Sequence, residues 1–405
     1  MAECTLGEAE RPPKEEEPLD VTVRSVAGEQ VASLRLPARS CVLELLHRLA
    51  AELSVPVFTL RLVLTGSASS ATLDEEAVLA DLPQPLDLTL VILTVNTEMG
   101  TSLLYNSERG DLKKVRSAIF SATNPDYADA QGRTATWFAS ARGHLDILSL
   151  LLEVKADANK AKSDGITPLH TAAARCRVRV LRLLCAASVD LDVAPPDGRT
   201  PLFMAAAAGH PKSVRVLCDA QADLNKASLD GWTPLMRAAA SGHTEVAEIL
   251  CSVGADTSRV SQEGCSALFA AATRGHADVV AALCAARADL DLATHDGTTP
   301  LFAASVQGFV PIVQLLCQAA ADANRAKEDS ATPLLMAASS GYVDVARLLC
   351  AAGARDGVTA LEVAARHGHS EVATALREAD FEDKKGSEKK PSSRRAERSG
   401  AQTAS

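Results

Sequence analysis

Histidine and cysteine are the residues of this 405-residue chain with the widest chemical repertoire. The ten Cys could act as nucleophiles or bind metal ions, and the nine His could act as general bases or metal ligands. However, most of them recur at one position of a repeating pattern, which indicates residues that build the fold. Five His directly follow the same Gly position: His144, His210, His243, His276 and His369. Six Cys share another position: Cys185, Cys218, Cys251, Cys284, Cys317 and Cys350.

The remaining candidates for catalysis are His170 and Cys176, a potential base and a potential nucleophile. Nothing near them in the sequence suggests an oxyanion donor. The chain also contains no Cys-x-x-Cys pair, no phosphate-binding Gly-rich loop that ends in Gly-Lys-Ser/Thr, and no His-Glu-x-x-His metal motif. We therefore expect no catalytic residues, no metal site and no cofactor, so the chain is interpreted as a non-enzyme.

The repeating pattern has a period of 33 residues. Eight units open at Glu98, Gln131, Asp164, Asp197, Asp230, Glu263, Asp296 and Asp329, and a ninth opens at Asp356 after a shorter interval. In the unit that opens at Asp230, Thr233 is suited to cap a helix and Pro234 to occupy its first turn. Gly242, the thirteenth residue, is suited to the left-handed conformation that ends this helix. A second amphipathic helix follows, with Val246, Ile249, Leu250 and Cys251 on its apolar side.

Fixed self-similarity at this period, with Thr167-Pro168-Leu169-His170 near the start of one copy, resembles the ankyrin repeat family. The resemblance implies a mainly α-helical solenoid of about nine helix-loop-helix units over residues 98–380. It also implies that His170 holds the start of its helix, and that each unit relies on its neighbours for a complete core. Equivalent helices stack about 8 to 10 Å apart, too far for a disulfide, so the Cys series is expected to stay reduced and to fill core positions. One unit carries Cys176 at the Gly position, which predicts a strained left-handed backbone there.

Residues 20–95 follow a different pattern, with two alternating strands, a helix over Cys41 to Leu53, and later strands over Leu60 to Leu64 and Leu86 to Thr94. This order resembles ubiquitin and its relatives, and implies a small α+β β-grasp domain. The resemblance places Val26, Val63 and Val91 at the apolar patch through which such domains are recognised, although one or more of them could instead face the core. The family's exposed Gly-Gly tail is missing here, so conjugation to other proteins is not expected.

Composition and charge indicate the state of the terminal segments and the function classes that are not expected. Residues 1–19 are acidic and residues 381–405 are rich in Lys, Arg, Ser and Glu, so both are expected to be disordered. The net charge of -10 argues against nucleic-acid binding, and the absence of a long apolar stretch argues against membrane insertion. A cytoplasmic location is expected, with nuclear import through the basic pairs of residues 381–405 as the alternative.

Positively charged residues cluster at variable positions of the units. Arg109, Arg142, Arg175 and Arg274 directly precede the Gly position, and Arg133 and Arg199 are at the tips of the loops. We expect these residues to bind an acidic protein segment, although ordinary solvated or internally paired charges would give the same pattern. Trp232, also at a loop tip, is the strongest candidate for an interface anchor. Trp137 replaces the motif His and is expected in the core.

We therefore interpret the chain as an intracellular scaffold that binds partner proteins on the face formed by its first helices and loop tips. Two alternatives stay open. The chain could be an adaptor that links a client protein to the ubiquitin-proteasome system through residues 20–95. It could also be the regulatory subunit of an enzyme, although no unassigned segment is long enough for a catalytic domain.

Overall fold

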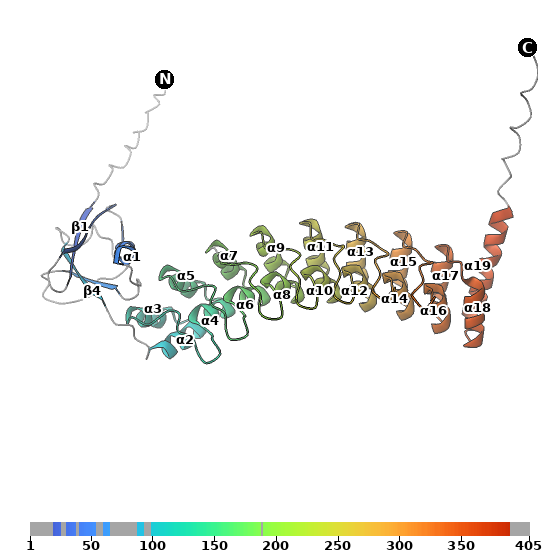
Figure 1. The fold of residues 1–405 in the computed structure, drawn as a ribbon, viewed down its shortest axis with the longest axis horizontal. Helices are drawn as coiled ribbons and strands as arrows, with labels where there is room; N and C mark the ends of the chain where they lie inside the picture. The colour runs from blue at the N-terminus through green and yellow to red at the C-terminus, as the bar shows by residue number, and fades with distance from the viewer. Residues whose placement is uncertain are drawn as a thin grey trace, which may run out of the picture. The chain divides into compact units, whose positions relative to one another are not determined.

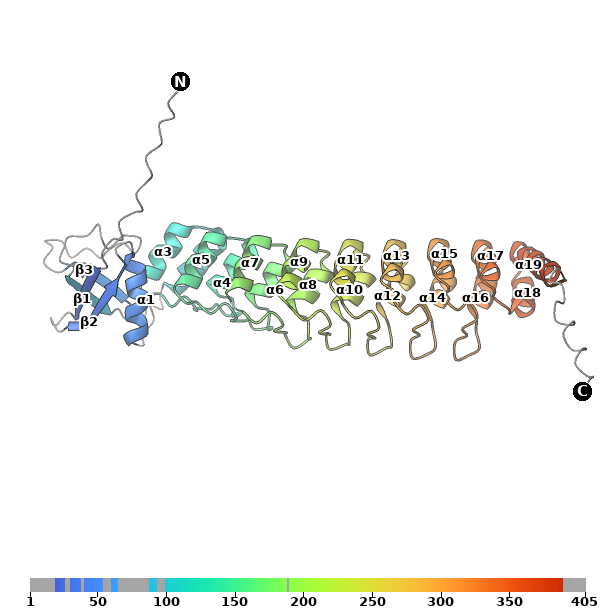
Figure 2. The same cartoon turned by 90° about the horizontal axis from the view of Figure 1, so that it is seen from above.

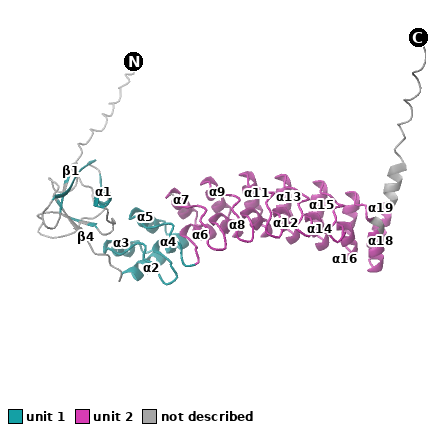
Figure 3. Ribbon diagram, in the orientation of Figure 1, with its two compact units in different colours: residues 1–163 teal, residues 164–405 magenta. Residues whose placement is uncertain are grey.

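The computed structural model describes residues 19–25, 30–37, 40–53, 60–64, 87–92, 99–187 and 189–388. The chain divides into two compact units, which Figure 3 shows in different colours. Unit 1 comprises Met1–Ser163 and unit 2 comprises Asp164–Ser405. The domain bounds expected from the sequence stay predictions, and each unit is described by itself below.

Unit 1 begins with a four-stranded mixed sheet in the order β2-β1-β4-β3. Its strands are β1 (Leu19–Ser25), β2 (Gln30–Leu36), β3 (Leu60–Leu64) and β4 (Asp87–Ile92). Strand β1 pairs antiparallel with β2 and parallel with β4, and β3 pairs antiparallel with β4. The first and last strands therefore lie side by side at the centre of the sheet.

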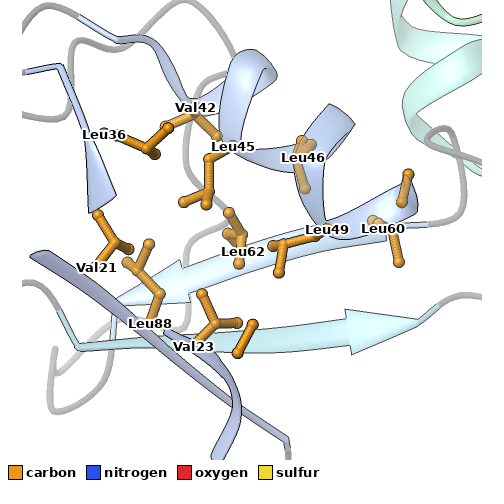
Figure 4. Packing of buried hydrophobic residues seen from close by; sticks show 12 residues of the cluster. Val21, Val23, Leu36, Val42, Leu45, Leu46, Leu49, Leu60, Leu62 and Leu88 are labelled. Carbon is orange, nitrogen blue, oxygen red and sulfur yellow. The ribbon is translucent and has the colours of Figure 1, made fainter. Parts of the chain in front are cut away.

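Helix α1 (Val42–Leu53) supplies the other half of the core of this sheet. Figure 4 shows Leu45, Leu46 and Leu49 pointing from the helix toward Val21 and Leu62 on the strands. All five side chains are at most 1% exposed. Helical spacing on one side and strand alternation on the other thus create a single apolar layer.

Nine helix pairs follow within the described residues. The first helices of the pairs are α2 (Gly100–Arg109), α4 (Ala135–Arg142), α6 (Pro168–Ala174), α8 (Pro201–Ala207), α10 (Pro234–Ala240), α12 (Ala267–Arg274), α14 (Pro300–Gln307), α16 (Pro333–Ser340) and α18 (Gly357–Arg366). The second helices are α3 (Leu112–Phe120), α5 (Leu145–Glu153), α7 (Val178–Ala186), α9 (Pro211–Asp219), α11 (Thr244–Ser252), α13 (Ala277–Ala285), α15 (Val310–Gln318), α17 (Val343–Ala351) and α19 (Ser370–Glu388). Within unit 2, first helices form one row and second helices form another (Figure 1).

The start and the end of the first helix follow the expected local chemistry. The hydroxyl of Thr233 accepts a hydrogen bond from the backbone N–H of Met236 at 3.2 Å, and Pro234 occupies the first turn. Gly242 then has a left-handed backbone, with φ of 73°. Cys176 at the equivalent position also has a left-handed backbone, with φ of 54°, so the expected strain at this residue is confirmed.

Each helix pair in unit 2 packs on its neighbours. Helix α10 contacts α8 on one side and α12 on the other, and α11 contacts α9 and α13. Leu235 and Ala238 of α10, together with Val246 and Leu250 of α11, are at most 1% exposed because these neighbours cover them. The loops between the repeats of unit 2 project on the side of the first helices (Figure 2). The expected solenoid of stacked helix pairs is therefore confirmed.

The last helix extends beyond the end expected for the repeats. Helix α19 continues past Asp380 to Glu388, through a stretch rich in Glu and Lys. These residues have high helix propensity and can continue a helix that the last repeat has already nucleated. Residues 389–405 lie outside the described part of the chain.

Truncation of Leu45 is expected to destabilise the sheet, because among the described residues the apolar cluster around it is formed by side chains of α1 and the four strands. Leu45→Ala removes a fully buried side chain and should lower local stability by about 2 to 5 kcal/mol. Hydrogen exchange of residues 30–36 and 60–64 measures this loss, with exposed Arg48→Ala as the control. Unchanged exchange in these strands would contradict the assigned core.

Candidate functional site

The repeated histidines join adjacent repeats. His243 approaches the carbonyl oxygen of Ala207 in the preceding repeat with Nε2 at 3.1 Å, so Nε2 donates the hydrogen bond. Its ring also lies against Gly209, where an added Cβ would come within 2.7 Å of ring atoms. The same bond is made by His144, His210, His276 and His369 to the carbonyls of Glu108, Ala174, Ala240 and Ser339. The prediction that these histidines build the fold is confirmed.

His170 holds the start of its helix and also contacts the next repeat. Its Nδ1 accepts hydrogen bonds from the backbone N–H of Thr167 at 3.2 Å and from the Thr167 hydroxyl at 2.8 Å. Its Nε2 donates to the carbonyl oxygen of Arg199 at 3.0 Å. Burial lowers the pKa of the imidazole to about 4. Both ring nitrogens are therefore engaged, and neither is available to activate Cys176.

The cysteine series differs from its expected place in the core. Cys185, Cys218, Cys251, Cys284, Cys317 and Cys350 are all free thiols, and each is partly exposed. They lie in the last turn of the second helices. Burial raises the pKa of the thiols of Cys185, Cys251, Cys284 and Cys317, and raises that of Cys218 to about 11, where the nearby Asp219 carboxylate adds to the effect. Thiols with raised pKa values are poor nucleophiles at neutral pH.

Two kinds of functional feature are absent from the described part of the chain. Across these residues, no group of three or more His, Cys, Asp or Glu is arranged to hold a metal ion. No helix among them combines the length and the apolar character that crossing a bilayer requires. Surface side chains of the helix pairs are therefore the remaining candidates for a functional site.

The first helices have an unusual charge distribution. In the seven first helices from α4 to α16, no residue is Asp or Glu, although the chain has a net charge of -10. Three of these helices carry Arg: Arg142 in α4, Arg237 in α10 and Arg274 in α12. The acidic residues of the repeats are instead in the second helices, in the loops, and in the first helices α2 and α18, which contain Glu108 and Glu362. The first helices α4 to α16 are thus neutral or basic within an acidic protein.

In unit 1, the expected binding arginines contact nearby side chains. Arg142 pairs with Glu108, with 2.6 Å between Nη2 and Oε1, and both side chains are substantially exposed. Arg109 donates to the hydroxyl of Tyr105 at 3.0 Å, and Tyr105 is 57% exposed. Arg133 pairs with Asp129 at 2.7 Å and covers the ring of Phe138. These contacts hold the guanidinium groups in place, and exposed ion pairs of this kind contribute little stability.

Trp137, which was expected in the core, is only partly buried. Its ring packs edge-on against Phe138, with 5.3 Å between the centroids. The indole N–H has no hydrogen-bond partner within the described part of the chain, although the nitrogen itself is buried. An indole is larger than the imidazole that occupies this position in His170, which explains why part of the ring stays at the surface.

In unit 2, the expected arginines are at the surface. Arg175 is exposed at the end of α6, and Arg199 pairs with Asp197 at 3.0 Å between Nε and Oδ2. Arg274 donates from Nη1 to the carbonyl oxygen of Ala240 at 2.9 Å. Trp232 is half-buried rather than fully exposed, because the side chains of Arg237 and Arg274 cover its ring.

Arg237 was missed by the reasoning from sequence. Its guanidinium lies 5.1 Å from the ring centroid of Trp232 and 5.5 Å from that of Phe203 in the preceding repeat. The available signal was a charged residue at the eighth position of the unit, where equivalent positions carry uncharged residues such as Met204 and Ala270. Only the stacking of the repeats shows that this arginine contacts two aromatic rings.

The side chains of the expected ubiquitin-like patch lie outside the described part of the chain. Val26 lies outside the described residues. Val63 is in β3 and pairs with Thr89, and Val91 is in β4 and pairs with Arg61. The side chains of both valines lie outside the described part, so the patch stays a prediction.

Comparison with protein families finds one match. The family model for ankyrin repeats, which describes three copies at a time, matches residues 103–195, 180–261, 253–327 and 321–385. These matches overlap and together span residues 103–385, more than half of the chain. Comparison with curated proteins gives no match.

The low pKa of His170 predicts how stability depends on pH. The folded imidazole titrates at about 4 and the unfolded one at 6.5, so the unfolded chain binds the extra proton between these values. Above pH 6.5 the titration of His170 does not affect stability. As the pH falls to 4, the uptake of a proton by His170 in the unfolded chain lowers the free energy of unfolding by roughly 3 kcal/mol. His170→Gln keeps a donor and an acceptor but cannot titrate, so urea unfolding of this variant should depend less on pH. An identical pH dependence in both proteins would contradict the assignment.

Proposed function

Because the chain belongs to the ankyrin repeat family, whose members typically bind other proteins, we propose that it is a scaffold for protein partners. The proposed binding surface comprises the first helices and the loop tips, which form the concave face in ankyrin arrays. Arg109, Arg133, Arg142, Arg175, Arg199, Trp232 and Arg274 are the proposed contact residues on this surface. Partners are proposed to present acidic segments.

The observation that carries this proposal is the absence of Asp and Glu from the first helices α4 to α16, in a chain with a net charge of -10. First helices without carboxylates do not repel an acidic segment, and the Arg residues beside them offer paired N–H donors that match a carboxylate. Charge complementarity of this kind favours fast and selective encounter with the partner. The ion pair between Arg142 and Glu108 is exposed, so a partner carboxylate can replace Glu108 at little cost.

The sheet of unit 1 supports a second proposal. We infer that residues 20–95 form a ubiquitin-like β-grasp domain, since the parallel pairing of β1 with β4 and the hairpin of β1 and β2 are the arrangement that the resemblance implies. An adaptor role through Val26, Val63 and Val91 depends on this domain. Capture of ubiquitin-system proteins by the full chain, and its loss in Val63→Asp, tests that role; equal capture by both proteins would exclude the patch.

The scaffold proposal predicts a specific effect of charge. Reversal of Arg109, Arg142 and Arg175 to Glu should lower the capture of acidic partner proteins by more than about tenfold, because carboxylates would then face carboxylates. Quantitative mass spectrometry of captured proteins measures the change. A matched control reverses the exposed Arg179, Arg182 and Arg215 of the second helices, which alters the net charge equally. Equal losses in both variants would show a general charge effect and contradict the proposed surface.

A further inference from the structure

The guanidinium of Arg237 contacts two aromatic rings from different repeats. The guanidinium carbon lies 5.5 Å from the ring centroid of Phe203 and 5.1 Å from that of Trp232. Phe203 is 2% exposed and belongs to the buried core, so it cannot move aside. Arg274 also lies 6.0 Å from the Trp232 ring and donates a hydrogen bond to the carbonyl of Ala240. Aromatic and cationic groups thus alternate across three successive repeats.

This arrangement fixes the position of Arg237 but leaves its donors free. Rings stabilise a guanidinium by contact with its flat faces, whereas its N–H groups point outward in its own plane. Arg199 and Arg274 use such donors for Asp197 and for the carbonyl of Ala240. The N–H groups of Arg237 have no acceptor among the described residues. The guanidinium of Arg237 is therefore partly buried and held in place, and its N–H groups have no acceptor within the described part of the chain.

The surroundings of Arg237 define which acceptor would fit. Helices α8, α10 and α12 contain no Asp or Glu, so no carboxylate of these helices can supply the acceptor. Apolar surface lies nearby, because Leu229 is 68% exposed in the turn that the backbone hydrogen bond from Ser228 to Trp232 closes. Acidic residues occupy the same loop tips, among them Asp197, Asp230 and Glu263, and would repel a polyanion such as nucleic acid. A single carboxylate beside an apolar side chain fits these conditions best.

We propose that Phe203, Leu229, Trp232, Arg237 and Arg274 form an anchoring site for one Asp or Glu side chain of an extended protein segment. Arg237 binds the carboxylate through two parallel N–H donors, and Arg274 adds a second positive charge. An apolar residue of the segment, next to the carboxylate, covers Trp232 and Leu229. The proposal rests on the scaffold function above and adds Arg237, Phe203 and Leu229, together with the chemistry of the bound segment.

The rings give this site a strength that an isolated surface arginine does not have. A free Arg side chain loses rotamer entropy when it binds, whereas Arg237 is already held in one orientation before the partner arrives. The cation–π contacts with the two rings also stabilise the charged, planar guanidinium. For this reason Lys, a point charge without a planar fork, should be a poor substitute at this position.

A random peptide library displayed on phage and selected on the full-length protein tests the proposal. The selected peptides should share an Asp or Glu adjacent to an aromatic or aliphatic residue. Affinity is then measured with one selected peptide and with its amide counterpart, in which Asn or Gln replaces that acidic residue. A Trp137→Phe background leaves Trp232 as the remaining tryptophan, so its fluorescence reports binding at this site.

Arg237→Gln and Arg237→Lys should each weaken the acidic peptide by at least about tenfold and leave the amide peptide nearly unchanged. Arg215→Gln, on a second helix, is the matched control and should have no effect. Circular dichroism and the thermal midpoint confirm that each variant is folded, and Arg237→Lys, which keeps the charge, decides the outcome if Arg237→Gln does not fold.

Each other outcome overturns the proposal. Acidic peptides whose binding depends on Arg109 and Arg142 but not on Arg237 would exclude this site while the scaffold proposal stands. Selected peptides without a shared carboxylate, or a failure to select any peptide, would contradict both the site and an acidic partner. Equal losses for the acidic and amide peptides would show that Arg237 only maintains the local fold.

Discussion

The dependence of each helix pair on its neighbours is the physical constraint that organises the repeats. Two short helices joined by a tight turn cannot cover their own apolar side chains. In unit 2, Leu235, Val246 and Leu250 become buried only because α8, α9, α12 and α13 flank α10 and α11. Hydrogen bonds from backbone N–H groups to side chains also join adjacent repeats at equivalent positions. The backbone N–H of Asp223 donates to Asp192, and that of Asp256 donates to Asn225, each at 2.9 Å from one repeat to the next.

The same constraint decides which positions can carry function. Positions that cap the helices, fill the core or contact the preceding repeat are limited to a few residue types, such as Thr at the helix start and Gly at its end. The twelfth position, at the end of the first helix, is exposed in every unit, as in Arg109 and Arg274, whereas the eighth is buried in some units and half-buried or exposed in others. The third position lies in the loop before the first helix. In the repeat that opens at Asp230, the third and eighth positions hold Trp232 and Arg237. A regular scaffold thus places variable side chains at regular intervals on one surface.

Much of this organisation could be predicted from the sequence, because it depends on local chemistry. The period, the Thr-Pro helix starts, the left-handed Cys176 and the role of His170 all follow from residues close together in the chain. The contacts of Arg237 could not be predicted in this way, since Phe203 is in the preceding repeat and its orientation depends on how the repeats stack. The same reason explains the partial burial of Trp232 and the partial exposure of the Cys series, both of which depend on the adjacent repeat.

The most direct test of this account is hydrogen exchange after creation of a cavity in one central repeat. Leu250→Ala removes a side chain that is 0% exposed, in the repeat that spans residues 230–262. If the repeats depend on their neighbours, protection should fall in residues 197–229 and 263–295 as well as in the altered repeat. Loss of protection confined to residues 230–262 would show that the repeat is stable by itself and would contradict the account.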